Sequence, residues 1–225
     1  MKIGIIIQAR MNSTRLPGKV LKPIAGKCLL DHILDRLSLL ENLLNIVVAT
    51  TNSSLDDLIV THCNSRNIAV FRGSEDDVLG RYYECAKAYH FEHVIRLTAD
   101  NPFTDIEELH NLFEQHLFEE NDYTHSFGSM PLGVGAEIFS FQALKKSAKS
   151  ADAPNYREHV NEYIQEHPHL FKIGILNAPY SKHSKNLRLT IDTEEDYYKL
   201  CLIAERSIDQ YLSTEELISL CLQSV

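Results

Sequence analysis

The sequence predicts an α/β protein, in which a parallel β-sheet is covered by helices on both faces. Short apolar runs rich in β-branched residues recur along the first 120 residues, as expected of strands buried on both faces. Between these runs, apolar residues recur every three or four positions, which is the period of an amphipathic helix. Alternation of the two patterns is typical of a parallel sheet, because parallel strands are joined by helical crossovers.

Four strand–helix pairs make up the first half of the chain. The predicted strands are residues 3–7, 46–51, 68–71 and 93–98. The predicted helices are residues 29–40, 54–66, 78–89 and 106–118. Ser74, with Asp77 at capping-box spacing, predicts the start of the third helix. Residues 8–27 are predicted to form a long loop, because their Pro and Gly residues oppose regular structure.

The second half is less regular. We expect one domain over residues 1–225, with an insertion region at about 122–185. The strands predicted there and beyond are residues 122–126, 136–141, 171–176 and 187–191. The last of these alternates apolar and polar residues, as a half-exposed strand does. The predicted helices are residues 144–149 and 156–166, and one helix each after Thr193 and Ser213, where an acidic residue stands at capping-box spacing.

Composition excludes several classes of protein. The 225 residues include 31 acidic side chains against 22 Lys and Arg, so the formal charge is -9. Proteins that bind nucleic-acid polymers normally carry a basic surplus, and we expect no such partner. No apolar run reaches the ~20 residues of a membrane span, so we expect no membrane partner. The five cysteines are odd in number and form no CxxC pair, which favours reduced thiols in the cytoplasm over disulfides or a thiolate zinc site.

The average charge hides a basic segment at the start of the chain. Six cationic residues precede Asp31, the first acidic one: Lys2, Arg10, Arg15, Lys19, Lys22 and Lys27. A basic segment on an acidic protein suits a small polyanion, although a solvated basic surface is the simpler explanation for charge alone.

The expected fold indicates where a ligand would bind. In open α/β sheets, ligands bind beyond the carboxyl ends of the strands. The loop after the first strand reads Q-A-R-M-N-S-T-R-L-P-G-K from Gln8 to Lys19. Small and hydroxyl residues with Arg and Lys can surround an anion with backbone N–H groups and positive charge. The loop lacks the Walker A pattern, and no GxGxxG follows the strand, so it predicts a different kind of phosphate site.

Two aspartates end predicted strands. Asp100 follows the strand at 93–98, and Asp192 follows the segment at 187–191. Either one alone is better explained as a structural cap or strand terminator. Together, beside a cationic loop, they predict a Mg²⁺ site for phosphoryl or nucleotidyl transfer, because Mg²⁺ with a nucleotide takes one or two protein carboxylates.

The same segments resemble a known family. The loop Gln8 to Lys19 closely resembles the opening loop of the spore-coat polysaccharide biosynthesis protein F family, which belongs with the cytidylyltransferases that activate sialic acid and Kdo. The resemblance continues through F-R-G-S-E-D-D-V-L, R-L-T-A-D-N-P, G-A-E-I-F-S, R-E-H-V and L-T-I-D-T-E-E-D, in this order along the chain. It implies a three-layer α/β/α, glycosyltransferase-A-like nucleotide-diphospho-sugar transferase fold, with a mostly parallel and partly mixed sheet.

The resemblance also implies roles for individual residues. Arg15 and Lys19 resemble the catalytic cations that face phosphate, and Asp100 and Asp192 the Mg²⁺ ligands. Glu137 and His159 lie in segments used around the acceptor, and the insertion region at about 122–185 would serve acceptor binding or dimerisation. The residues implied to contact the nucleotide are Gln8, Ala9, Arg10, Ser13, Arg72, Gly73 and Ser74.

Two positions depart from the family pattern. Many relatives read V-L-D-R-Y where this chain has Gly80 in V-L-G-R-Y, and Asn12 stands where Gly is common. Gly80 puts in question a polar role at that position and the usual acceptor.

The implied activity is Mg²⁺-dependent transfer of CMP from CTP to an acidic sugar or related acceptor, with release of pyrophosphate, for surface polysaccharide. Its partners would be CTP and the acceptor, and the family likeness suggests a homodimer. Two alternatives are a glycosyltransferase of the same fold and a catalytically weak nucleotide-binding subunit. Residue patterns alone do not rank CTP above other nucleotides.

Overall fold

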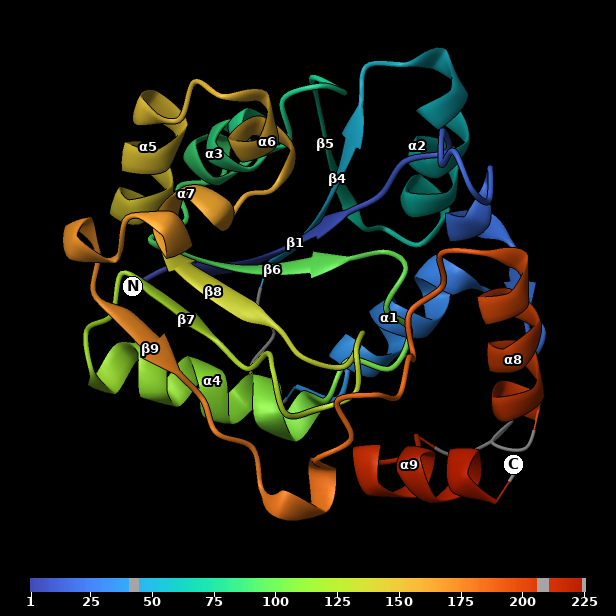
Figure 1. Cartoon of the computed structure of the whole chain (residues 1–225). Helices are drawn as coiled ribbons and strands as arrows, with labels where there is room; N and C mark the ends of the chain where they lie inside the picture. Colours follow the sequence, from blue (N-terminus) through green and yellow to red (C-terminus); the bar gives the residue numbers. More distant parts are fainter. Residues whose placement is uncertain (41–44, 206–210, 224–225) are drawn as a thin grey trace.

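The computed structural model describes residues 1–40, 45–205 and 211–223. Within them, seven strands form one sheet in the order β5-β4-β1-β6-β8-β7-β9 (Figure 1). Four parallel strands confirm the predicted parallel core: β1 (Ile3–Gln8), β4 (Asn45–Thr51), β5 (Ala69–Gly73) and β6 (His93–Thr98). The remaining three are β7 (Tyr123–His125), β8 (Glu137–Ser140) and β9 (Ile173–Ile175). Because β8 runs antiparallel to β6 and β7, the sheet is mixed at this side.

Helices cover both faces of the sheet. One face is covered by α3 (Val78–Ala88), α5 (Phe141–Ser150), α6 (Pro154–Glu158) and α7 (Glu162–Glu166). The other is covered by α1 (Leu29–Leu37), α2 (Asp57–Ser65) and α4 (Ile106–Phe118). Successive residues of β1 serve opposite faces, because Ile5 and Ile7 pack with α1 while Ile6 packs with α3. The three-layer architecture is therefore the one expected.

The last two helices close the molecule at one side. Figure 1 shows α8 (Glu194–Glu205) and α9 (Thr214–Leu222) on the side of α1, far from α3 and α5. Both predicted capping patterns are present. Ser213 and Glu216 form a capping box, and Thr193 and Asp196 exchange backbone–side-chain hydrogen bonds. A third apolar cluster, which includes Leu16 and Leu189, lies under these helices.

Short elements interrupt the segments between these helices and strands. The predicted loop at 8–27 contains a 3-10 turn, η1 (Lys19–Leu21), and a small hairpin of β2 (Pro23–Ile24) and β3 (Lys27–Cys28). Further 3-10 turns are η2 (Ser54–Asp56), η3 (Pro168–Leu170) and η4 (Tyr180–Lys182).

The third helix begins at Val78, as predicted, but its cap is a different residue. Asp77, and not Ser74, is its N-cap, and its carboxylate accepts a hydrogen bond from Gly80 N at 2.8 Å. Ser74 forms the preceding turn, where its hydroxyl accepts from Asp77 N. The motif contains two side chains that can cap, and the one nearer the first helical turn does so.

Two predicted elements of the second half differ in the structure. Residues 156–166 do not form one helix, because the chain is extended at His159 between α6 and α7. Residues 187–191 form a single bridge, Leu132 with Arg188, and not a strand. Leu189 and Ile191 are fully buried, so the alternation reflects a segment that packs into the apolar cluster beneath α8 rather than a half-exposed strand.

The structure bears on two expectations from composition. All five cysteines are free in the structure. Among the described residues, no helix combines the length and the apolar content that a membrane crossing requires.

Candidate active site

The loop after β1 is fixed at its start by a buried carboxylate. Asp56, 1% exposed, accepts hydrogen bonds from Thr50 Oγ1 at 2.8 Å, Thr51 N at 3.0 Å and Met11 N at 2.8 Å. Burial alone would raise the pKa of Asp56, but these hydrogen bonds, above all from Thr51, lower it. A hydrogen-bonded carboxylate therefore joins the end of β4 to the loop.

Farther along, the loop is held by an apolar anchor and a left-handed turn. Leu16 is buried in the cluster beneath α8, and Gly18, with φ of 70°, donates its N–H to Met11 O at 2.8 Å. This conformation favours glycine. Residues 12–15 are thus held as an arch between two fixed points, and the chain after Gly18 places Lys19 under it.

Lys19 lies at the centre of the site. Its Nζ donates to Asp100 Oδ2 at 2.8 Å, to Asp192 Oδ1 at 3.2 Å and to Ile191 O at 2.6 Å. The Lys19 side chain is 10% exposed. The two aspartates are held together by the backbone as well, because Ile191 N donates to Asp100 O at 2.9 Å. The structure therefore brings together the cation and both carboxylates that were predicted from distant segments.

Two further cations surround Asp192. Arg15 Nη2 lies 2.9 Å from Asp192 Oδ1, and Arg188 Nη2 lies 3.0 Å from Oδ2. Burial would raise the pKa of Asp192, but Lys19, Arg188 and Arg15 together lower it. Both carboxylate oxygens of Asp192 therefore contact cationic side chains.

The atoms that could bind a metal ion at this centre are all oxygens. Asp100 and Asp192 supply carboxylates and Ile191 a carbonyl, while the Thr98 hydroxyl donates to Asp100 Oδ1 at 2.5 Å. Hard oxygen donors around one position suit Mg²⁺, which prefers one or two carboxylates with phosphate and water. The residues present therefore fit this ion.

Two cavities meet at the aspartates. The first, of about 180 Å³, is lined by the loop and its neighbours, including Gln8, Ala9, Arg10, Ser13, Arg15 and Lys19. The second, of about 400 Å³, extends along β6 and β8 and is walled by apolar side chains such as Phe127 and Met130. Thr98, Asp100 and Asp192 line both. A ligand in the first cavity would therefore meet a ligand in the second at the aspartates.

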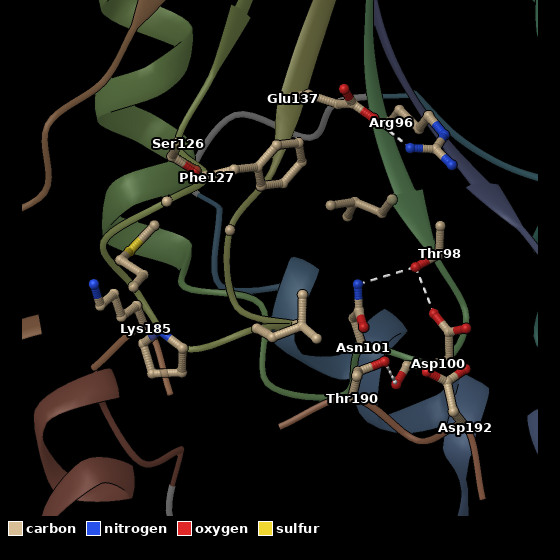
Figure 2. A pocket seen from close by; sticks show the side chains of 17 residues that line it. Arg96, Thr98, Asp100, Asn101, Ser126, Phe127, Glu137, Lys185, Thr190 and Asp192 are labelled. Atoms are coloured by element: carbon tan, nitrogen blue, oxygen red, sulfur yellow. Dashed lines mark hydrogen bonds and ion pairs between the residues drawn. The ribbon is translucent and has the colours of Figure 1, made fainter. Parts of the chain in front are cut away.

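The second cavity has a polar end built on Glu137. Figure 2 shows Arg96 and Glu137 paired on one side of it and Lys185 on the opposite side. The Glu137 side chain is 1% exposed, and it pairs with Arg96 and accepts from Tyr123 Oη at 2.5 Å. Burial lowers the pKa of Arg96, but Glu137 more than compensates and raises it. Arg96 Nε is buried without a hydrogen-bond partner among the described residues.

The other predicted site residues lie elsewhere. Arg72, Gly73 and Ser74 line a third cavity, of about 550 Å³, between β5 and α3. The Arg72 guanidinium is already engaged, because it pairs with Asp57 at 2.6 Å and donates to the carbonyls of Thr51 and Ser53. His159 lines none of these three cavities, and its side chain is 54% exposed near Glu162.

Sequence reasoning missed three residues that shape the site: Asp56, Arg96 and Arg188. Asp56 was predicted only as a residue in the first turn of the helix at 54–66. Its hydrogen bond from Met11 N shows that it holds the loop. Arg96 carried a signal, because a charged residue inside an apolar strand requires a partner or a ligand. Arg188 belonged to the segment interpreted as a half-exposed strand.

Comparison with known proteins gives consistent matches. A family model described as cytidylyltransferase matches residues 4–222. The spore coat polysaccharide biosynthesis protein SpsF of Bacillus subtilis is 38% identical over 224 residues, covering 97% of this chain and 93% of that protein. A cytidylyltransferase structure from Leptospira borgpetersenii has a TM-score of 0.94 at 32% identity, covering 100% of this chain and 95% of that one. A CMP:2-keto-3-deoxy-manno-octonic acid synthetase complexed with CTP has a TM-score of 0.70 at 15% identity, covering 92% and 99%, and it is similar in fold.

Proposed function

The chain belongs to the cytidylyltransferase family, and we propose that it transfers CMP from CTP to an acidic sugar or related acceptor for surface polysaccharide. The observation that carries the proposal is the junction of two cavities at Asp100, Asp192 and Lys19. One cavity is cationic and suits a triphosphate, whereas the other is larger and suits the acceptor. The name of the Bacillus subtilis relative supports the polysaccharide, and the CTP complex of the synthetase supports the nucleotide.

In this proposal the nucleotide lies in the first cavity. Backbone N–H groups of the arch and the side chains of Arg10 and Ser13 bind the phosphates, and Gln8 and Ala9 form the floor at the end of β1. Arg15 and Lys19 stabilise the charge that develops on the α-phosphate oxygens. An acceptor hydroxyl attacks the α-phosphorus, and pyrophosphate leaves from the opposite side.

Asp100 and Asp192 would hold Mg²⁺, which supplies positive charge to the phosphate oxygens when bound. The chain's own contribution is position. Thr98 fixes one oxygen of Asp100, and the Ile191–Asp100 backbone hydrogen bond fixes the spacing of the two carboxylates. Such preorganisation lowers the barrier because little rearrangement is left for the reaction step.

The acceptor is proposed to lie in the second cavity. Its apolar wall of Phe127 and Met130 suits the face of a sugar ring, and Arg96 and Lys185 suit an acidic group. Glu137 would act through Arg96, because both of its carboxylate oxygens are engaged. A cytoplasmic enzyme and a homodimer are part of the proposal; free cysteines are compatible with the first, and family likeness suggests the second.

The test is pyrophosphate release. Purified protein with Mg²⁺ is given each of the four nucleotides, with a panel of acidic sugars and the matching neutral sugars. The proposal is supported if pyrophosphate is released only when CTP is combined with an acidic sugar. A finished nucleotide sugar that serves as donor would favour the glycosyltransferase, and CTP binding without pyrophosphate from any acceptor would favour the nucleotide-binding subunit.

A further inference from the structure

The ammonium of Lys19 lies where a divalent cation would be expected. Its Nζ contacts one oxygen each of Asp100, Asp192 and Ile191, at 2.6–3.2 Å. These are the oxygens that would face an ion shared by the two carboxylates. The side chain is 10% exposed, so the ammonium is enclosed rather than loosely associated.

A cation at this point and the ammonium exclude one another. Both need the same carboxylate oxygens, and two positive charges that share these oxygens repel each other strongly in a partly buried site. Asp192 is the more contested ligand, because Arg15 and Arg188 also contact its oxygens. Metal alone should therefore bind weakly to the free protein.

A second set of anionic partners is within reach of the Lys19 ammonium. Lys19 also lines the loop cavity proposed for the triphosphate, together with Arg10 and Arg15. Its flexible four-carbon stem lets the ammonium exchange carboxylate oxygens for phosphate oxygens without movement of the backbone. Once the ammonium has moved, the position between Asp100 and Asp192 is free.

We propose that Lys19 is a resident cation that occupies the divalent position in the free enzyme and moves to the triphosphate when the nucleotide binds. Metal and nucleotide then bind cooperatively, because each favours the arrangement that the other requires. The inference rests on the proposed function only for the identity of the anion. Exclusion of the metal by Lys19 depends on this chain's residues alone.

The test titrates Mn²⁺ alone, without nucleotide, and follows free Mn²⁺ by electron paramagnetic resonance. The variant is Lys19→Met, and the matched control is Lys22→Met. In the wild type, the Lys22 ammonium lies over the Tyr197 ring, 4.9 Å from its centroid, and not between carboxylates. Removing one charge from a carboxylate pair should tighten Mn²⁺ binding by roughly tenfold or more in Lys19→Met. Lys22→Met should match the wild type, and adding Asp192→Asn to Lys19→Met should remove the gain.

A second measurement tests the other half of the exchange. CTP binding in EDTA should weaken by about tenfold in Lys19→Met, because one phosphate cation is lost. If Lys19→Met does not fold, Lys19→Gln retains a hydrogen-bond donor for Ile191 O and replaces it in both titrations. Unchanged or weaker Mn²⁺ binding in the folded neutral variant would overturn the inference. Wild-type protein that binds no CTP would instead overturn the proposed function, and the Mn²⁺ result would still decide the exclusion.

Discussion

Arg96 and Glu137 stand directly opposite each other on the antiparallel strands β6 and β8 and form an ion pair beside the second cavity. The carboxylate is buried, and Tyr123 holds its other oxygen. The pair presents a fixed guanidinium to the cavity, and Glu137 determines where that guanidinium lies.

Glu137→Gln should therefore weaken both stability and acceptor binding. Breaking a buried pair leaves an uncompensated charge and costs ~3–5 kcal/mol, which urea unfolding measures. In the assay, KM for the acidic acceptor should rise while KM for CTP is unchanged. The matched control is Glu114→Gln, an exposed position on α4, which should stay within about 0.5 kcal/mol of the wild type. Equal shifts of both KM values would argue against the placement of the acceptor near Arg96.

Lys19→Ala should reduce turnover far more than stability. Loss of one preorganised charge at a transition state lowers kcat by ~10²–10³, and pyrophosphate release measures this. Lys22→Ala is the control, since its side chain points to Tyr197. Full activity in Lys19→Ala would remove Lys19 from the mechanism.

Lys182→Met should destabilise the protein and leave CTP binding intact. The ammonium is 2% exposed and contacts Asp105 at 3.1 Å, Glu107 at 2.7 Å and Glu108 at 2.9 Å. Burial lowers the pKa of Lys182, but these carboxylates raise it above its ordinary value. Removing the cation should cost ~3–5 kcal/mol in urea unfolding. Lys149→Met, at an exposed position of α5, is the control, and equal stability of the two variants would contradict the prediction.

Stability should fall as the pH drops below about 6.5, in part because of His116. Its ring is fully buried between His93 and Thr124, and burial, with His93, lowers its pKa from 6.5 to about 3. The unfolded chain then binds the proton first, so this contribution is complete above pH 6.5 and is lost toward pH 3, at up to ~1.4 kcal/mol per pH unit. His116→Asn should reduce the slope of stability against pH, measured by urea unfolding at roughly pH 5 and pH 7. An unchanged slope would show that other groups carry the dependence.

Gly80 should be coupled to Asp77. A Cβ at Gly80 would lie 2.2 Å from Asp77 Oδ2, so Gly80→Ala displaces the helix cap. In an Asp77→Ala background this clash is absent, and Gly80→Ala should stabilise α3 by about 1 kcal/mol. In the native background the loss of the cap, ~0.5–2 kcal/mol, should cancel or reverse the gain. The double-mutant cycle in urea measures the difference, and equal effects in both backgrounds would contradict it.

The predictable part of the fold was the part with local signals. Strands β1, β4, β5 and β6 alternate with helices, and each apolar run shows its period without reference to distant residues. The segment before Asp192 gave the wrong element because its environment is set by tertiary contacts, with Leu132, far away in sequence, and with the apolar cluster beneath α8. A period of two does not distinguish a strand from an extended segment wedged between other elements.

The site was predictable to a similar degree. Strand ends and charge led to Lys19, Asp100 and Asp192, because the carboxyl ends of parallel strands share one edge. The ion-pair partner of each charged residue was not predictable. Glu137 was expected to face the acceptor, yet its two carboxylate oxygens contact Arg96 on β6 and Tyr123 on β7. The sequence identifies which residues are charged, and the partners of each charge emerge only in the folded chain.

The backbone hydrogen bond from Ile191 to Asp100 has a consequence for the order in which the protein matures. The sheet has all seven strands once Ile175 has been synthesised, and Asp100 is by then in place. Arg188, Ile191 and Asp192 follow later in the chain, and the segment that carries them is covered by α8. The residues of the sheet are thus all synthesised well before those that complete the proposed site. Any truncation that removes this last segment would keep the sequence of all seven strands and lose Asp192, one of the two carboxylates of the proposed magnesium site.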